Sequence, residues 1–171
     1  ELPFANQAEL EKQIPPLKKK FLYAEDFAQA TFTDIFPRDK LDKAEVLTAN
    51  YFSNAVLLNQ GNLNFKTQAL PWKAQLSSYR DAVVVDANHD SLPDVLLVGN
   101  YYDNNIQMGR YDADYGTLLV NHGKGVFSTE SLNGLQIKGQ VRHIHKINIS
   151  GREAFVLARN SDSTMVIQFD K

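Results

Sequence analysis

Short apolar runs divide the chain from residue 44 onward. Examples are residues 82–85, 95–98 and 118–120, and stretches rich in Gly, Asn and Asp separate them. Runs of this length that are rich in Val and Leu and bounded by turn-forming residues are typical of β-strands joined by tight turns. The pattern therefore predicts a mainly β module over residues 45–171.

The first 44 residues follow a different pattern. After Pro15-Pro16, a set of mostly apolar residues recurs at three- and four-residue steps, which is the period of one face of a helix. The set consists of Leu17, Phe21, Ala24, Phe27, Ala28, Thr31 and Ile35. Pro37 would stop or kink such a helix, because proline has no backbone N–H to donate. We predict a helical leader over residues 1–44 that packs on the β module.

Two sequence patterns recur along the chain at nearly the same spacing. The pattern N-x-G-x-x-x-F occupies residues 59–65 and again residues 121–127. Residues 80–100 match residues 142–160, and the later copy has lost two loop residues. A period of roughly 60 residues that contains strands and turns is typical of propeller blades or of a related array of stacked sheets.

These repeats set the predicted fold class. We expect a mainly β protein with two to three antiparallel β-propeller-type blades, preceded by the helical segment. The expected units are a partial one at about residues 45–65, a full one at 79–127 and a degenerate one at 141–169. Propellers close with four to eight blades, so this chain would form an incomplete propeller. Its open edges would then be covered by the helical leader, by missing blades or by self-association.

An acidic loop, D-x-N-x-D-x-x-x-D, lies at residues 86–94 between two of the apolar runs. Its three carboxylates and one amide would crowd one another without a cation, and Ca²⁺ binds six to eight oxygens of this kind. The predicted ligands are the side chains of Asp86, Asn88, Asp90 and Asp94 and the backbone carbonyl of Leu92. An EF-hand is excluded, because Ser91 and Leu97 stand where that motif needs Gly and Glu. The alternative is an acidic hairpin that binds nothing.

Composition narrows the functional classes. The chain has 171 residues, of which 43% are hydrophobic, and a formal net charge of −2. This balance gives no electrostatic case for binding nucleic acid or an anionic membrane. No apolar run reaches the length of a membrane span. The absence of cysteine excludes disulfides, thiol catalysis and thiolate metal sites, so calcium is the one cofactor that we expect.

The order of these elements resembles a known repeat family. An apolar strand, the acidic loop, a second apolar strand and then L-L-V-N-x-G-x-G-x-F at residues 118–127 look like the FG-GAP/VCBS repeat. This repeat is the blade unit of integrin-type β-propellers and of many large secreted bacterial proteins. Residues 79–127 carry a full unit, and residues 21–27 and 109–113 resemble the C-terminal region of long bacterial proteins with such repeats.

The resemblance implies the same five calcium ligands that the loop chemistry suggests. It departs from the family at Ser91, where the family usually has Gly. It also implies an exported bacterial protein located outside the cell, at the cell surface or in the periplasm. A calcium site also favours a location outside the cell, because weak calcium sites fill only where calcium is millimolar.

The connection at residues 100–115 is longer than a turn requires, and it mixes charged with aromatic side chains. Its candidate ligand-binding residues are Tyr101, Tyr102, Arg110, Asp112 and Tyr115. Such a mixture suits recognition of a protein or a glycan. The alternative is an internal Arg110–Asp112 pair that anchors the loop. His143 and His145 share one strand face, and the repeat places His145 opposite Val83, so we expect packing in the core instead of metal binding.

Catalysis has little support in the sequence. It contains no G-x-S-x-G, no H-E-x-x-H, no P-loop and no cysteine. We therefore expect a non-catalytic, calcium-stabilised β-repeat module of an exported bacterial protein, which serves as a scaffold for protein or glycan recognition. The alternative is a fragment of a larger secreted hydrolase or polysaccharide-processing enzyme whose active residues lie elsewhere.

Overall fold

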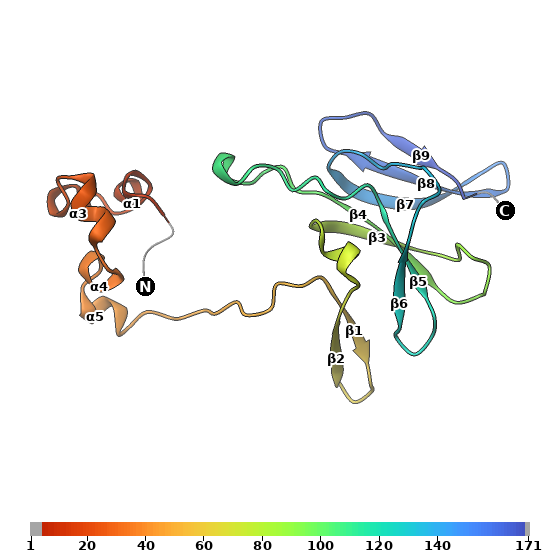
Figure 1. Ribbon diagram of the computed structural model, residues 1–171, viewed down its shortest axis with the longest axis horizontal. Coiled ribbons are helices and arrows are strands. Elements are labelled where there is room, and N and C mark those ends of the chain that lie inside the picture. The colour runs from red at the N-terminus through yellow and green to blue at the C-terminus, as the bar shows by residue number, and fades with distance from the viewer. Residues whose placement is uncertain (1–4, 170–171) are drawn as a thin grey trace. The chain divides into compact units, whose positions relative to one another are not determined.

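The computed structural model describes residues 5–169, and the chain divides into two compact units, Glu1–Asn50 and Tyr51–Lys171. The first unit is helical and the second is built from β-strands (Figure 1). These observations confirm a mainly β fold preceded by a helical segment. The packing of the helical leader on the β module stays a prediction.

Between residues 5 and 44 the chain forms five short helices, so the prediction of one helix face over residues 17–35 is wrong. They are α1 (Gln7–Gln13), α2 (Leu17–Lys20), α3 (Ala24–Gln29), α4 (Phe32–Ile35) and α5 (Arg38–Leu41). The backbone is extended at Phe21 and Ala30, which end α2 and α3, and Thr31 and Asp34 form a capping box that starts α4. Because the chain turns at each break, the apolar side chains meet between helices. The buried cluster contains Leu17, Phe21, Ala30 and Ile35.

The described β unit contains three antiparallel sheets (Figure 1). The first pairs β1 (Ala55–Asn59) with β2 (Phe65–Ala69), and the second has the order β3 (Tyr79–Val85), β4 (Asp94–Gly99), β5 (Thr117–Asn121), β6 (Phe127–Glu130). The third has the order β7 (Val141–Ile149), β8 (Arg152–Arg159), β9 (Met165–Ile167). Two short 3₁₀ helices, η1 (Trp72–Gln75) and η2 (Ile106–Met108), lie in the connections. These sheets do not close into a ring within residues 5–169.

The β1–β2 and β5–β6 hairpins have the same turn, at equivalent positions of successive repeats. In both, the Asn that ends the first strand accepts a hydrogen bond from the Gly N–H two residues later, at 2.8 Å for Asn59–Gly61 and 2.9 Å for Asn121–Gly123. Three consecutive residues in each turn have positive φ, a region that glycine enters without steric cost. The repeated N-x-G pattern is therefore a repeated turn geometry.

The β3–β4 and β7–β8 pairs also correspond. A register shift interrupts the first pair between Tyr79 and Asp81, and another interrupts the second pair at the equivalent position, between Val141 and His143. The four-stranded sheet is thus one complete repeat. The β7–β9 sheet matches its first three strands, and the β1–β2 sheet matches its last two.

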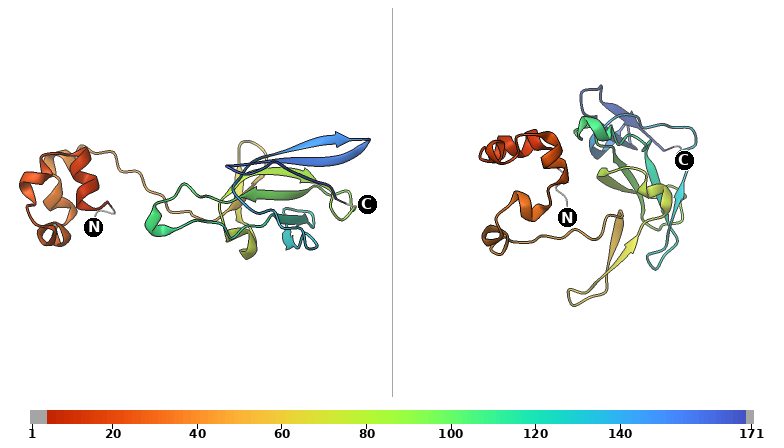
Figure 2. Two further views of the ribbon diagram at one scale, coloured as in Figure 1. Left: turned by 90° about the horizontal axis from the view of Figure 1, so that it is seen from above. Right: turned by 60° about the vertical axis from the view of Figure 1, so that its left-hand side comes forward.

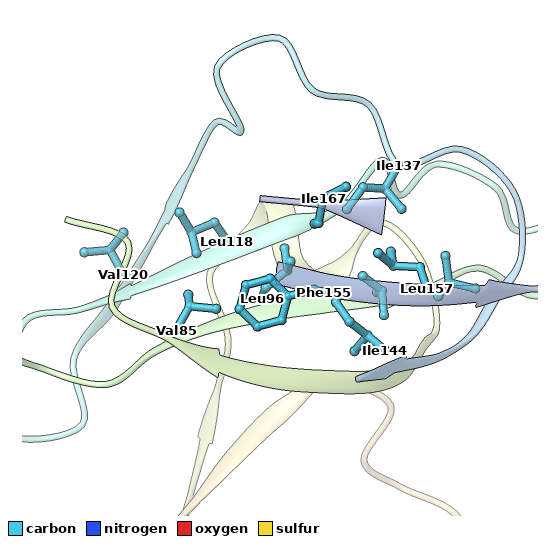
Figure 3. Packing of buried hydrophobic residues seen from close by; sticks show 11 residues of the cluster. Val85, Leu96, Leu118, Val120, Ile137, Ile144, Phe155, Leu157 and Ile167 are labelled. Atoms are coloured by element: carbon cyan, nitrogen blue, oxygen red, sulfur yellow. The ribbon is translucent and has the colours of Figure 1, made fainter. Parts of the chain in front are cut away.

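The main core lies between the four-stranded sheet and the β7–β9 sheet, which lie one over the other (Figure 2). Leu96 and Leu118 extend from the first sheet, and Phe155, Leu157 and Ile167 extend from the second (Figure 3). Leu96 and Leu157 are fully buried. Burial of such side chains stabilises the fold by roughly 1.5–3 kcal/mol each.

The opposite face of the four-stranded sheet carries a second cluster. Its buried members are Ala74, Leu97 and Leu119, with Leu70 and Phe127 packed beside them. The middle sheet therefore has an apolar cluster on each face, which explains why β4 is buried along almost its whole length. The β1–β2 hairpin also contacts the turn between β5 and β6, because the Gln68 side chain donates to the Gly125 carbonyl at 2.7 Å.

The expectation that His145 packs in the core is wrong. Its side chain is exposed, and it lies beside Val156 on the face of the β7–β9 sheet that points away from the four-stranded sheet. The equivalent residue one repeat earlier, Val83, packs against the main core. The difference arises because only the earlier face has a second sheet over it.

Candidate functional site

The acidic loop connects two neighbouring strands of the four-stranded sheet. β3 ends at Val85 and β4 begins at Asp94, so residues 86–93 form the turn between them. His89 and Ser91 have φ of 61° and 65°, the left-handed conformation that glycine adopts more readily. The backbone therefore takes the left-handed conformation at Ser91, the position where the resemblance expects Gly.

Asp94 is the structural anchor of this loop. Its side chain is fully buried, and its carboxylate accepts hydrogen bonds from the backbone N–H of Ala87 at 3.0 Å and of Asn121 at 2.8 Å. The first bond closes the loop, and the second joins it to the end of β5. Charge-assisted bonds of this kind are stronger than neutral ones, so Asp94 holds three chain segments together.

The other predicted ligands lie at the exposed part of the loop. Asp86 accepts from the Ser91 N–H at 3.3 Å, and Asp90 accepts from the Leu92 N–H at 2.7 Å. Asn88 accepts from the Asp90 N–H at 3.1 Å and donates to the Asp90 carboxylate at 2.8 Å. These local bonds shape the loop from its own polar side chains.

Among residues 5–169, no three His, Cys, Asp or Glu side chains are arranged around one point as metal ligands. In the described loop the three carboxylates accept hydrogen bonds from different backbone N–H groups. The donor set fits calcium in kind, since carboxylate and amide oxygens are the hard ligands that this ion prefers. Asp86 and Asp90 are both exposed, whereas Asp94 is buried.

The equivalent turn in the next repeat has none of this chemistry. It joins β7 and β8 through Ser150 and Gly151, which have φ of 52° and 83°, and Asn148 accepts from the Gly151 N–H at 2.9 Å. Ala154 stands at the position of Asp94 and is also fully buried. The acidic loop is therefore a feature of one repeat and is not required by the hairpin itself.

The loop at residues 100–115 uses its aromatic rings internally. Tyr101 and Tyr111 exchange backbone hydrogen bonds at 2.9 Å, which makes the two legs of the loop antiparallel. The guanidinium carbons of Arg80 and Arg110 lie 4.9 Å from the ring centroids of Tyr101 and Tyr102, respectively. Such cation–π contacts stiffen the loop. Two predicted binding residues, Tyr102 and Arg110, thus contact each other, whereas the Tyr101 ring contacts Arg80 of β3.

The remaining predicted binding residues, Asp112 and Tyr115, are exposed and lie on the returning leg. The ion pairs of the described residues do not include an Arg110–Asp112 pair, so the anchor is an arginine–tyrosine contact instead. The tip of the loop carries two residues that the sequence did not single out. Ile106 is 96% exposed and Met108 is 54% exposed.

The base of the loop is fastened by Asn100, whose role sequence reasoning missed. Its side chain is buried, donates to the carbonyls of Asp114 and Gly139, and accepts from the Asp114 N–H and the Ser77 hydroxyl. A signal was present in the repeat, because Asn160 directly follows β8 as Asn100 directly follows β4. The backbone N–H of Asn160 donates to the Gln140 carbonyl at 2.8 Å, as that of Asn100 donates to the Ser78 carbonyl at 2.8 Å.

Asp114 and Tyr79 meet at the hydroxyl of Thr117. That hydroxyl donates to the Asp114 carboxylate and accepts from the Tyr79 hydroxyl, each at 2.9 Å. Burial raises the pKa of Asp114 above its ordinary value, and burial raises the pKa of Tyr79 to about 12. Both shifts make the charged form of the group less favourable than it is in water, and both groups belong to a hydrogen-bonded network at the base of the loop.

In comparisons with known proteins, no family model, no curated protein and no solved structure matches this chain. The likeness to FG-GAP/VCBS repeats therefore stays a prediction. Within residues 5–169, no helix has both the length and the apolar character needed to cross a membrane.

Proposed function

We propose that this chain is a non-catalytic, calcium-stabilised β-repeat module of an exported bacterial protein, and that it serves as a scaffold for protein or glycan recognition. The observation that carries the proposal is the acidic loop at residues 86–94, which is anchored by Asp94 at the junction of β3, β4 and β5. In this proposal, each of the three sheets corresponds to a propeller-type blade or to part of one.

Electrostatics favours a cation at the loop. Asp86, Asp90 and Asp94 lie close together in sequence, and Asp94 is removed from water. Like charges that lie close together in space destabilise the folded state unless a counter-charge offsets them. Calcium would supply that charge, and it would fix the exposed half of the loop to the half that Asp94 already holds. Its role would be structural.

A melting experiment tests the calcium part of the proposal. Binding to the folded state alone raises stability by about 2.7 kcal/mol at a hundredfold excess of ligand over Kd. We expect a higher melting temperature in millimolar calcium than in chelator for the full chain. Asp90→Asn should remove this difference, whereas Asp112→Asn in the other loop should keep it. Equal melting in calcium and chelator would identify an acidic hairpin that binds no calcium.

The recognition part of the proposal rests on the loop at residues 100–115. Its arginine–tyrosine contacts and its Asn100 clamp reduce the entropy cost of binding, since the loop is ordered beforehand. The exposed tip residues Ile106 and Met108, with Asp112 and Tyr115 nearby in sequence, offer the apolar and polar contacts that binding surfaces combine.

Two variants separate recognition from a purely structural role. Replacing Ile106 and Met108 by Ser should abolish binding on a glycan array or to a protein ligand while the melting temperature stays unchanged. Tyr102→Ala removes the Arg110 contact and should weaken binding by loosening the loop. Normal binding by the Ile106 and Met108 variant would show that this loop is not the recognition surface.

A further inference from the structure

The packing between the two larger sheets provides a template for a second interface. Inside the chain, the face of the four-stranded sheet that carries Leu96 and Leu118 packs on the face of the β7–β9 sheet that carries Phe155 and Leu157. In every repeat, we call the face equivalent to the one with Leu96 and Leu118 the forward face. We call the face equivalent to the one with Phe155 and Leu157 the rear face. Each sheet has one face of each kind, because the strand registers repeat.

The β7–β9 sheet leaves its forward face open. Val156 and Val166 are cross-strand neighbours in this sheet, as Leu96 and Leu118 are in the four-stranded sheet. Val156 is therefore equivalent to Leu96, and Val166 is equivalent to Leu118. Leu118 is 6% exposed, whereas Val166 is 51% exposed. Ile147 and the exposed His145 lie on the same face. An apolar face of a repeat is thus presented to solvent.

The β1–β2 sheet leaves its rear face open. Leu57 and Phe65 are equivalent to Leu119 and Phe127, which occupy the same positions one repeat later and pack in the second cluster. Leu119 is 3% exposed, but Leu57 is 62% exposed and Phe65 is 55% exposed. Hydrophobic residues that pack in a cluster in one repeat are therefore largely exposed in the other.

We propose that these two open faces bind each other between two copies of this chain, head to tail. The forward face of the β7–β9 sheet in one copy would receive the rear face of the β1–β2 sheet in the next, which repeats the pairing already seen inside the chain. The four-stranded sheet lies between the β1–β2 and β7–β9 sheets (Figure 1), so one copy does not bring its own open faces together. Such a heterologous interface uses a different surface on each partner.

The mass of the full chain in solution, measured by analytical ultracentrifugation over a range of concentrations, tests this proposal. Wild type should form species larger than a monomer as concentration rises. Leu57→Glu and Val166→Glu each place a carboxylate on one open face, and each variant alone should associate at least about a hundredfold more weakly, because a buried unpaired charge is costly. Both positions are exposed, so melting of the monomer should change little.

Mixing the two variants gives the decisive result. Leu57→Glu retains its forward face and Val166→Glu retains its rear face, so an equimolar mixture should form a heterodimer and nothing larger. Val46→Glu, at an exposed position outside both open faces and outside the loop at residues 100–115, is the control and should associate as wild type does.

Several results would overturn the proposal. They are a wild type that stays monomeric at the highest attainable concentration, a single face variant that still associates, a mixture that stays monomeric, and loss of association in the Val46 control. The Leu57→Glu substitution could also lower the melting temperature of a chain that is monomeric. This result would mean that another part of the same chain covers the face, and the proposal would again be wrong.

Discussion

The carboxylate of Asp81 accepts a hydrogen bond from the backbone N–H of Ile144 at 3.0 Å, and this bond joins β3 of one repeat to β7 of the next. The same carboxylate accepts from the Ala82 N–H at 2.8 Å, and His143 Nδ1 lies 3.5 Å away. Burial by itself would raise the pKa of Asp81, but the hydrogen bonds and the nearby imidazole hold it below its ordinary value.

Asp81→Ala should destabilise the β unit. The Ile144 N–H would lose its acceptor in a buried position, which costs about 1–3 kcal/mol. Urea unfolding at neutral pH measures the change. Asp103→Ala is the control, since Asp103 pairs with Arg142 at an exposed site where such a pair contributes about 0–1 kcal/mol. Equal losses for the two variants would contradict a special role for the bond between repeats.

The lowered pKa of Asp81 also predicts an acid dependence. Because the folded-state pKa lies below the unfolded value near 3.8, the stabilising contribution is present above that value and is lost as pH falls through the folded pKa. Asp81→Asn should therefore show a weaker loss of stability in acid than wild type. Identical acid profiles for the two chains would assign the acid sensitivity to other carboxylates.

Asp114 should behave in the opposite way. Its raised pKa means that the folded state holds a proton more tightly than the unfolded state, so stability falls as pH rises from about 3.8 through the folded pKa. Asp114→Asn keeps an acceptor for the Thr117 hydroxyl but has no charge to desolvate. We expect this variant to be at least as stable as wild type at pH 7 and to lack that fall in its pH profile. A less stable Asn variant at pH 7 would show that the ionised carboxylate is favoured there.

Two glycines of the β5–β6 turn separate backbone strain from packing. Gly123 and Gly125 have φ of 81° and 79°, but a Cβ on Gly123 meets nothing within 4 Å, whereas one on Gly125 would lie 2.5 Å from Leu58 Cδ1. Gly123→Ala should cost about 1–2 kcal/mol from its conformation alone. Gly125→Ala should cost more in chemical denaturation, and adding Leu58→Ala should remove the excess. An equal cost for both glycines would mean that the β1–β2 hairpin does not approach this turn.

Leu119 and Leu57 occupy equivalent positions in successive repeats but differ in burial. Leu119→Ala should cost about 2–5 kcal/mol, the range for removing a buried leucine side chain. Leu57→Ala should cost under about 1 kcal/mol when unfolding is measured on the monomer at low concentration. A large loss for Leu57→Ala under those conditions would show that its face is already covered within one chain.

Local patterns predicted the strands, the turns and the repeat, because each depends on residues close in sequence. Gly61 and Gly123 allow the same positive φ wherever they occur, so the N-x-G pattern reports the turn directly. The acidic loop was likewise placed between two strands. Its calcium occupancy stays a prediction, since the local bonds around Asp90 explain the loop shape without an ion.

Similar sequences nevertheless took different structures. Five residues between positions 46 and 56 have identical counterparts 110 positions later in the chain. They are Val46, Leu47, Asn50, Ser53 and Val56, which match Val156, Leu157, Asn160, Ser163 and Val166. Val156 and Leu157 lie inside β8, whereas Val46 and Leu47 lie in no strand and are 81% and 85% exposed. A strand needs neighbouring backbone as its hydrogen-bond partner, so an apolar pattern alone does not form one.

The sequence by itself determined the β periodicity, the repeat length and the chemistry of the acidic loop, since these depend on backbone preferences and side-chain type over a few residues. Only the tertiary structure decided which apolar faces are buried and how Asn100 clamps a loop closed at Asp114. It also decided that His145 faces solvent while its equivalent Val83 packs against the core. The physical reason is that burial and long-range hydrogen bonding belong to pairs of surfaces, and a residue takes its environment from the segment that folding brings against it.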